Sequence, residues 1–431
     1  MLKSSLSKST LSASQIEIIN EQLQQIMSHP ARPLASLAAV AFVDGEICYE
    51  GYFGHRQIDP TDDTRSLPVN QNTKYRVASI SKLVTSLGIM QLAEQDKLSL
   101  DADVSDYLGF KLRNPHHPDT AITLRMLLSH TSSIRDGDES YSLPLPHTMS
   151  DFFDPASPHY HDGCHWAEPD QKPGIFFTYS NLNYGLVGTL IEVASGQRFD
   201  RYIHEHLLSP LGIDASYNIS GFSETSLQNL ATLYRKQSAG GTWHPHGPWV
   251  PQVDDYRSTA PINSVPDAYT IGTNGTLFSP QGGLRISTRD LVKIALLISG
   301  NGAYQGIKLL ESDTIHTMLT SVWTYQESAG NGDPYGGLMR QWGLGIHLTT
   351  DTIQGDRLVE GVSLSYVGHS GDAYGLHSGL WFDPKSASGF AFCIGGVSDN
   401  PVNHCGQYSA FYRWEEEIMT VLHQAQYNKV R

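Results

Sequence analysis

Apolar residues follow two different patterns near the two ends of the chain. Near the start, they recur at helical spacing from Ile16 to Met27, and a later apolar run breaks at the turn Asp44-Gly45 before it resumes. We expect a helix followed by a β-hairpin over Ala35–Glu50. Toward the end, the pattern predicts three strands and a final helix, at Trp342–Leu348, Leu376–Phe382, Gly389–Gly395 and Ala410–Gln424.

The middle of the chain has a different character. Its periodicity predicts helices at Ser79–Gln95, Tyr184–Ala194, Arg198–Leu208 and Arg289–Ser299. Residues 140–175 and 215–280 are rich in Pro, Gly, His and aromatics, and we expect long ordered loops there. Strands at both ends with an insert between them predict an α+β fold rather than a doubly wound parallel sheet. In this fold, both chain ends form an antiparallel sheet flanked by helices, and the insert is mainly helical.

The composition is that of a folded protein with an excess of acidic side chains. The 431 residues are 39% hydrophobic and 17% charged, which disfavours a disordered chain. With 29 basic and 44 acidic residues, the net charge is −15, so we expect neither nucleic acid nor anionic lipid as a partner. No run of about 18 apolar residues occurs, so we expect no transmembrane segment.

The first residues and the cysteines bear on the compartment. Lys3 and Lys8 have no apolar stretch behind them, so no secretory signal is visible. We therefore expect a cytoplasmic protein, or a periplasmic or secreted one if a leader was removed. Four cysteines are too few for a disulfide scaffold. Cys393 and Cys405 are 12 residues apart and could meet, but in a cytosolic protein we expect free thiols.

The segment Ser79-Ile80-Ser81-Lys82 places a lysine three residues after a serine at the start of a predicted helix. Residues with this spacing share one helix face. A serine hydroxyl is a weak nucleophile until a base takes its proton, and a lysine whose pKa is lowered by burial can be that base. Because S-x-x-K is common by chance, the alternative is a helix-capping Ser79 beside a solvated Lys82.

Two further short motifs carry compatible chemistry. Tyr179-Ser180-Asn181 precedes a predicted helix, and it supplies a phenol that can relay protons and an amide that can orient the substrate or Lys82. His369-Ser370-Gly371 ends in a glycine that permits close approach of a substrate backbone, as on an edge strand. Taken singly, each motif also has a structural explanation: a core tyrosine, a satisfied histidine or a turn glycine.

In this order, S-x-x-K, Y-S-N and H-S-G resemble the motifs of the class C β-lactamase-like family of serine hydrolases, which is related to penicillin-binding proteins and includes D,D-peptidases, D-aminopeptidases and esterases. Other segments are similar to the family's own, namely Tyr75–Ser79 through Leu98–Asp101, Ile122–Ser132, and Ser279–Leu284 with Ser287–Leu291. The matches span about Ala35 to Gly395. The resemblance implies one β-lactamase-like catalytic domain over 31–425, after a tail and helix over 1–30. Its α/β part would cover about 31–76 and 285–425, and its helical part about 77–284.

The resemblance also implies roles for the first two motifs. Ser79 would be the acylated nucleophile. Lys82 and Tyr179 would share the general-base and general-acid steps, and which of them acts first stays open. Asn181 would bind the acyl side of the substrate.

The third motif would complete the site. The backbone N–H of Asp372, directly after His369-Ser370-Gly371, would form an oxyanion hole with that of Ser79. His369 and Ser370 would hold the leaving-group side or a substrate carboxylate. The family often has lysine where His369 stands, and a histidine is at most partly protonated near neutral pH. We therefore expect a weaker hold on a β-lactam carboxylate, which fits the family's peptidases and esterases.

Other chemistries lack their motifs. G-x-S-x-G, a P-loop, and a G-x-G-x-x-G after a strand do not occur, so neither an α/β-hydrolase nor a nucleotide site is predicted. His159, His161, Cys164 and His165 have side chains that suit zinc, but they lie within seven residues and lack a second ligand pair. We expect a polar loop there, and neither a metal nor a cofactor.

Three functions remain open. The first is a serine hydrolase that forms an acyl-enzyme on an ester or amide, with D-amino-acid peptides among the candidates, so that the partner is a small-molecule or peptide substrate. The second is a β-lactamase in the narrow sense. The third is a non-catalytic member that binds a ligand or assembles, and the complete Ser–Lys–Tyr set argues against it. The sequence leaves the oligomeric state open.

Overall fold

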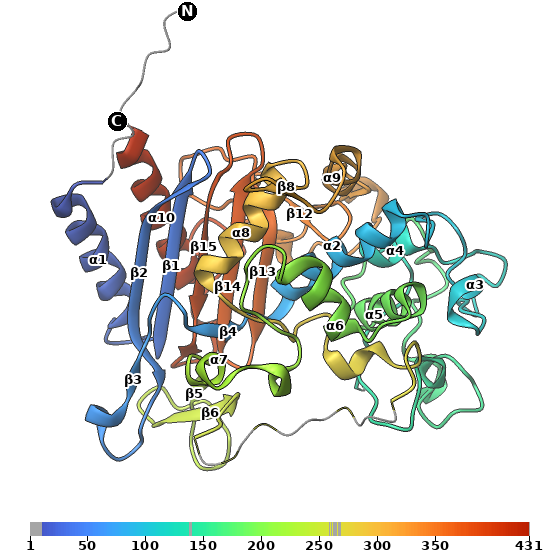
Figure 1. Ribbon diagram of the computed structural model, residues 1–431, viewed down its shortest axis with the longest axis horizontal. Coiled ribbons are helices and arrows are strands. Elements are labelled where there is room, and N and C mark those ends of the chain that lie inside the picture. The colour runs from blue at the N-terminus through green and yellow to red at the C-terminus, as the bar shows by residue number, and fades with distance from the viewer. Residues whose placement is uncertain are drawn as a thin grey trace, which may run out of the picture.

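The computed structural model describes residues 11–137, 140–257, 259, 261, 265 and 269–430. Within these ranges, nine strands form one antiparallel sheet with helices on both faces (Figure 1). Across the sheet they are β10 (Trp323–Thr324), β11 (Gln341–Trp342), β12 (His347–Leu348), β13 (Val367–Ala373), β14 (Leu376–Asp383), β15 (Ser388–Ile394), β1 (Ser36–Val43), β2 (Glu46–Gln57) and β3 (Leu67–Pro68). Because β1 pairs with β15, both chain ends build the sheet, and the predicted α+β class is confirmed.

The helices form the layers around this sheet and, together with long loops, the other half of the molecule (Figure 1). They are α1 (Ala13–Met27), α2 (Ser81–Glu94), α3 (Ser105–Leu108), α4 (Leu124–Leu128), α5 (Leu182–Ser195), α6 (Phe199–Ile203), α7 (Glu224–Gln228), α8 (Thr288–Ser299), α9 (Ser312–Leu319) and α10 (Arg413–Val430). Short ladders join β4 (Lys74–Arg76) to β7 (Arg285–Ser287), β5 (Leu233–Lys236) to β6 (Trp249–Val253) and β16 (Gly396–Val397), and β8 (Ala303–Tyr304) to β9 (Ile307–Lys308). Along the described part of the chain, none of the helices combines the length and the apolar character needed to cross a bilayer.

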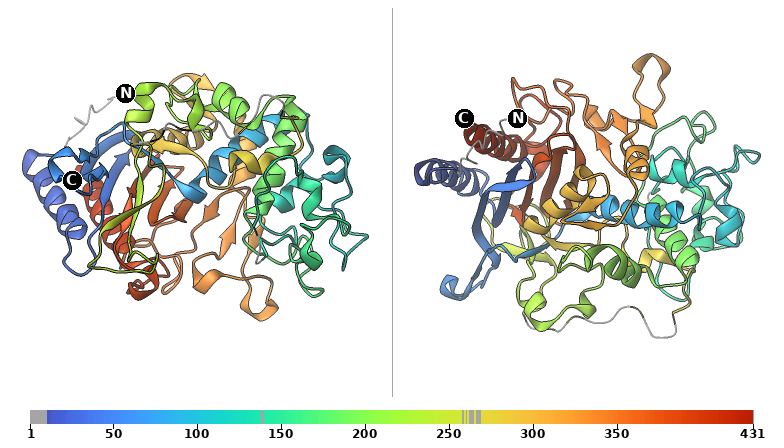
Figure 2. Two further views of the ribbon diagram at one scale, coloured as in Figure 1. Left: turned by 90° about the horizontal axis from the view of Figure 1, so that it is seen from below. Right: turned by 45° about the horizontal axis from the view of Figure 1, so that its top comes forward.

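Strand β1 is buried along its whole length because helices cover both of its sides. Alternate residues from Leu37 to Ala41 pack into a cluster with α1 and α10, whereas those from Ala38 to Phe42 join the larger core that contains α2 and α8. Figure 2 shows α1 and α10 side by side on one face of the sheet and α8 on the other. A strand buried on both sides has a continuous apolar sequence rather than an alternating one.

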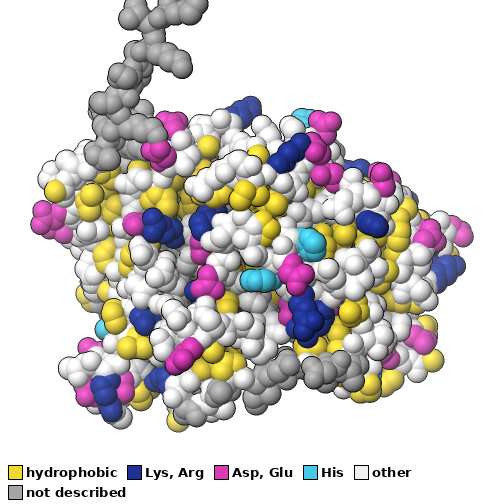
Figure 3. All heavy atoms as spheres, in the orientation of Figure 1, with side chains coloured by type: hydrophobic (Ala, Val, Ile, Leu, Met, Phe, Trp, Pro, Cys, Tyr) yellow, Lys and Arg dark blue, Asp and Glu magenta, His cyan; other side chains and the backbone are white. Residues whose placement is uncertain are grey.

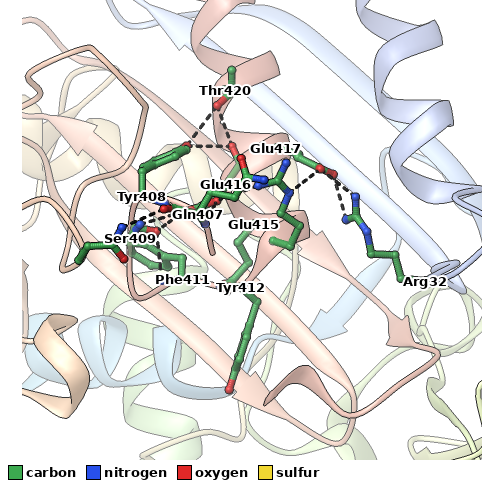
Figure 4. Close-up of polar contacts among 12 residues, drawn as sticks. Arg32, Gln407, Tyr408, Ser409, Phe411, Tyr412, Glu415, Glu416, Glu417 and Thr420 are labelled. Carbon is green, nitrogen blue, oxygen red and sulfur yellow. Dashed lines mark hydrogen bonds and ion pairs between the residues drawn. The ribbon is translucent and has the colours of Figure 1, made fainter. Parts of the chain in front are cut away.

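Helix α10 is tied by carboxylates to the loop before it and to the segment after α1 (Figure 4). Glu416 is buried and accepts hydrogen bonds from the backbone N–H groups of residues 407–409 at 2.8–3.0 Å and from the hydroxyl of Ser409 at 2.8 Å. Glu417 accepts both terminal nitrogens of Arg32 at 2.8 and 3.0 Å. These contacts fix α10 to the loop before it and to the segment between α1 and β1.

Two sequence-based predictions are wrong. Trp342–Leu348 is not one strand, because β11 and β12 form a tight hairpin in which Gly345 has a φ of +73°. The expected loop over 215–280 also contains α7, β5 and β6, and the half-exposed residues of β6 show no in–out alternation.

Other predictions hold or lie outside the described residues. The helices expected from Tyr184 and Arg289 occur, and the last helix begins at Arg413 rather than Ala410. The predicted tail includes residues 1–10, which lie outside the described residues. The division into a tail, an α/β part and a helical part stays a prediction.

On the face that Figure 3 shows, acidic and basic side chains are interspersed among apolar and uncharged ones. Among the described residues, Lys308 forms an exposed ion pair with Glu311. Exposed pairs of this kind contribute little to stability.

Candidate active site

Ser79 lies in a single 3₁₀ turn, Ala78–Ile80, between β4 and the start of α2. The sequence places this serine at the opening of the helix, and the structure adds this turn before the helix begins. Ala78 has a φ of +48°, a conformation that is uncommon for residues other than glycine. A Cβ on Gly371 of β13 would collide with the carbonyl oxygen of Val77, so the strand presses directly on the turn. This packing holds the half-buried Ser79 at a fixed place between the sheet and α2.

Lys82 is completely buried one helical turn after Ser79. Its Nζ lies 3.0 Å from Ser79 Oγ, 2.7 Å from Asn181 Oδ1 and 2.9 Å from the carbonyl oxygen of Gln281. Burial lowers the pKa of Lys82 to about 7, although the negative charge of Asp136 opposes this shift. An amine with this pKa is substantially neutral at physiological pH and can accept a proton from the serine hydroxyl.

Tyr179 brings its ring to 4.7 Å from Lys82 Nζ. Burial raises the pKa of its phenol well above the usual value, and hydrogen bonding by Ser79 opposes this shift. The hydroxyl is buried, yet it reaches full hydrogen-bond geometry with none of the described residues, so its contact with Ser79 is a loose one. The first two motifs therefore converge: the lysine and the phenol face the same serine.

His130 is a supporting residue to which the sequence assigned no role. Its φ is +57°, and its ring stacks on that of Tyr179 with centroids 4.4 Å apart. The Nδ1 atom accepts a hydrogen bond from the backbone N–H of Ser180 at 3.1 Å, which leaves the proton of the neutral ring on Nε2. Burial, with a smaller contribution from Lys82, lowers its pKa well below the usual value. A neutral His130 thus supports the Tyr179 motif, because it packs against the Tyr179 ring and accepts the backbone N–H of Ser180.

Asp136 is a second residue that the sequence analysis missed. One carboxylate oxygen accepts the backbone N–H groups of Asn181 and Leu182 at 2.6 and 3.0 Å and the hydroxyl of Ser180 at 3.1 Å. The other accepts Asn181 Nδ2 at 2.7 Å. Asp136 follows the His130 segment by six residues in a loop without periodicity, so no local pattern marks it.

The third motif lies on β13, along an edge that is open beyond Gly368. Strand β12 pairs only with Val367 and Gly368, and among the described residues no strand covers the outer side of the stretch from His369 onward. On the inner side, β14 pairs with β13 up to Ala373 and Leu376. This last pair closes a two-residue turn, so ladder alternation directs the N–H of Asp372 away from β14 and toward the open side.

His369 is buried beside Tyr179, with ring centroids 6.2 Å apart. Its Nδ1 lies 2.6 Å from the carbonyl oxygen of Ser370, so Nδ1 carries the proton and Nε2 is a bare acceptor. Burial and then the charge of Lys82 lower its pKa to about 3. The ring is therefore neutral, whereas the sequence allowed partial protonation, and it supplies no cation in the position where the family often has lysine.

The histidines considered for zinc do not converge. His165 is buried edge-on against Phe152, whereas His161 is exposed. His159 Nε2 lies 3.2 Å from the same atom of His147. Within the described residues, no group of three or more His, Cys, Asp or Glu side chains is arranged to hold a metal ion. A pairing of Cys393 with Cys405 is also absent, since the first is buried in the sheet and the second is exposed.

Comparisons with known proteins identify relatives of the chain. Protein flp of Staphylococcus aureus (strain N315) is 29% identical over 198 residues, which cover 44% of this chain and 36% of that protein. Penicillin-binding protein 4 of Amycolatopsis lactamdurans is 30% identical over 190 residues, which cover 43% and 45%. The chain thus spans less than half the length of these relatives.

A solved structure shares the fold along the whole chain. The D-amino acid amidase from Ochrobactrum anthropi SV3, complexed with L-phenylalanine amide, has a TM-score of 0.65 at 16% identity and is matched over 97% of this chain and 100% of its own. The model of the family described as Beta-lactamase matches residues 20–404. Together with the three converging motifs, this match shows that the chain belongs to the beta-lactamase family, with penicillin-binding proteins among its relatives.

Proposed function

We propose that the protein is a serine hydrolase that cleaves esters or amides through an acyl-enzyme on Ser79, and that residues 31–425 form its catalytic domain. The observation that carries the proposal is the contact of a completely buried lysine amine with the serine hydroxyl at 3.0 Å. A buried lysine outside a reaction centre would normally be paired with a carboxylate. Here the amine contacts three uncharged oxygens instead.

The reaction follows from this geometry. As Ser79 Oγ bonds to the substrate carbonyl carbon, its proton moves to the Lys82–Tyr179 pair, and the carbonyl oxygen becomes negative. The backbone N–H groups of Ser79 and Asp372 stabilise this charge, and such a donor is worth about 3 kcal/mol of barrier. The proton then passes to the leaving group as its bond to carbon breaks. Water attacks the acyl-enzyme by the same steps and releases the acid. Which of Lys82 and Tyr179 accepts the first proton stays open.

The neutral His369 bears on the choice of substrate. A β-lactam carries a carboxylate that a cation in this position would hold, and His369 offers only a bare nitrogen acceptor. Esters and amides without such a carboxylate do not need a cation here, so their binding is not weakened by a histidine in place of lysine. The fold shared with a D-amino acid amidase supports amides of D-amino acids as one class to test first.

The test uses a fluorophosphonate probe and a substrate panel. We expect one probe molecule to attach to each protein molecule, on the peptide that contains Ser79. The labelled protein should no longer hydrolyse p-nitrophenyl esters or D-amino-acid amides. A D-Ala-D-Ala peptide and a chromogenic cephalosporin complete the panel, and faster turnover of the cephalosporin would favour the β-lactamase alternative. Absence of labelling together with absence of turnover would overturn the proposal in favour of a binding protein.

A further inference from the structure

We propose that Asp136 is a positioning residue: it sets the orientation of the Asn181 amide and thereby directs the free electron pair of Lys82 at Ser79. This inference rests on the proposed function, because it assigns the base its direction. Asp136 touches neither Ser79 nor Lys82 by hydrogen bond, and it acts through Asn181. The argument has three steps, which concern the amide, the amine and the charge.

The amide has only one orientation that suits its neighbours. A carboxylate can accept hydrogen bonds but cannot donate them, so the Asn181 group that faces Asp136 at 2.7 Å must be the NH₂ group. The amide oxygen is then turned to the opposite side, where it lies 2.7 Å from Lys82 Nζ. The contact with Asp136 therefore decides which end of Asn181 the lysine meets.

The three oxygen atoms around Lys82 Nζ decide where its N–H groups and its free electron pair point. Neutral Lys82 has two N–H donors and one free electron pair. The amide oxygen of Asn181 and the carbonyl oxygen of Gln281 can only accept, so they take the two N–H groups. The electron pair is left for Ser79, which alone among the three can donate a proton. A reversed Asn181 amide would instead donate to the electron pair and leave Ser79 without a base.

The charge of Asp136 also reaches Lys82. The groups that face this amine are Asp136, the neutral rings of His130 and His369, and the phenols of Tyr179 and Tyr184 with their rings 4.7 and 5.5 Å away. Asp136 is the carboxylate among them, and it raises the pKa of the amine against the effect of burial. Removal of this charge should move the acid limb of kcat/KM to lower pH.

A purely structural role makes a different prediction. Asp136 also accepts backbone N–H groups at the start of α5, as a helix-capping residue does. If that were its whole task, a loss of the carboxylate would lower stability and leave the pH profile and the direction of Lys82 unchanged.

The experiment reverses the hydrogen-bond pattern and then restores it. In Asp136→Asn, the side-chain oxygen keeps the two backbone N–H groups and the Ser180 hydroxyl, so the new NH₂ faces Asn181 and favours the reversed amide. We expect kcat/KM for a p-nitrophenyl ester to fall about 100-fold or more, as for loss of a general base. In Asn181→Asp, two carboxylates face each other. The double variant Asp136→Asn with Asn181→Asp pairs a donor with an acceptor again. Its kcat/KM on the high-pH plateau should recover at least about tenfold over that of Asp136→Asn.

The pH profiles give a second signature. The acid limb should lie at lower pH in Asp136→Asn and at higher pH in the double variant, because the negative charge then contacts Lys82 directly. Titration of the ¹⁵N-labelled lysine amines by NMR should show the same opposite shifts for Lys82. The matched control is Glu416→Gln, which changes another carboxylate with four hydrogen bonds on the far side of the sheet.

The outcomes separate this inference from the proposed function. If the fluorophosphonate probe labels Ser79 but Asp136→Asn keeps its activity and its acid limb, the positioning role is wrong. The role is equally wrong if the double variant is no better than Asp136→Asn. If the probe does not label the wild-type protein, the proposed function fails, and the NMR titrations of Lys82 still decide whether Asp136 acts on the amine.

Discussion

Asp136 and Glu416 each accept four hydrogen bonds, one in the helical half of the molecule and the other under α10. Both hold backbone N–H groups and a serine hydroxyl. The hydrogen-bond donors of Glu416 all belong to the loop over residues 407–409, and it also forms an ion pair with Arg413, which pairs with Glu417 of the same helix. Asp136 has Asn181 as its fourth donor, and this side chain goes on to contact a buried lysine. The same local bonding thus serves stability in one place and directs a base in the other.

The largest effect should come from Ser79→Ala, which removes the proposed nucleophile from the site that Asp136 supports. We expect kcat to fall on the order of a millionfold, because loss of a serine nucleophile removes the covalent route. The melting temperature should stay close to that of the wild type, since the side chain is small and half-buried. Ester turnover and thermal melts measure the two quantities, and near-normal turnover would remove Ser79 from the mechanism.

Tyr179→Phe should have the next largest effect. It keeps the ring that stacks on His130 but deletes the hydroxyl that we propose moves protons, so we expect a loss of about 10²- to 10⁴-fold in kcat. Tyr366→Phe is the matched control, because that hydroxyl faces Gln426 of α10. Steady-state kinetics of the two variants should differ by at least tenfold, and equal kinetics would show that the phenol of Tyr179 has no catalytic task.

Glu416→Gln should change stability and leave chemistry alone. The amide presents an NH₂ group to backbone donors that the carboxylate satisfied, and a buried donor without an acceptor costs about 1–3 kcal/mol. Denaturant unfolding should show this loss, while kcat/KM at 25 °C stays within twofold of the wild type. A tenfold drop in the activity of the folded variant would contradict the distinction between the two carboxylates.

The pH dependence should give the most direct measure of the buried amine. Burial lowers the pKa of Lys82 from 10.5 to about 7. Below that pH the amine holds a proton and cannot accept one from Ser79, so kcat/KM should rise about tenfold per pH unit and level off above pH 7. Glu416→Gln should keep this midpoint. A rate that falls as the pH rises through 7 would mean that the protonated amine is the active form.

The sequence predicted the parts of this site that short motifs encode. Lys82 follows Ser79 by one helical turn, and Tyr179 and His369 stand in motifs with recognisable neighbours, so convergence could be inferred from family resemblance. Asp136 could not be found in this way, because an irregular loop carries it to the start of α5. The neutral state of His369 depends on burial and on the charge of Lys82, which only three-dimensional packing reveals.

The fold likewise shows that long local patterns could be predicted from the sequence and short ones could not. The strand expected from Leu376 was predicted correctly because eight consecutive residues belong to it. The hairpin of β11 and β12 was missed because each strand has only two residues, too few for a period to show.

The pairing of β1 with β15 has a consequence for how the polypeptide is made. Leu37 lies opposite Ile394, so the centre of the sheet cannot close until the ribosome has released the chain as far as β15. Contacts between residues so distant in sequence form slowly, because a very long loop must be ordered before they contribute. Until then, the apolar strand that begins at Ser36 lacks one of its two partner strands. A chain that stops before Ser388 would keep Ser79, Lys82 and Tyr179 but leave this strand exposed to aggregation.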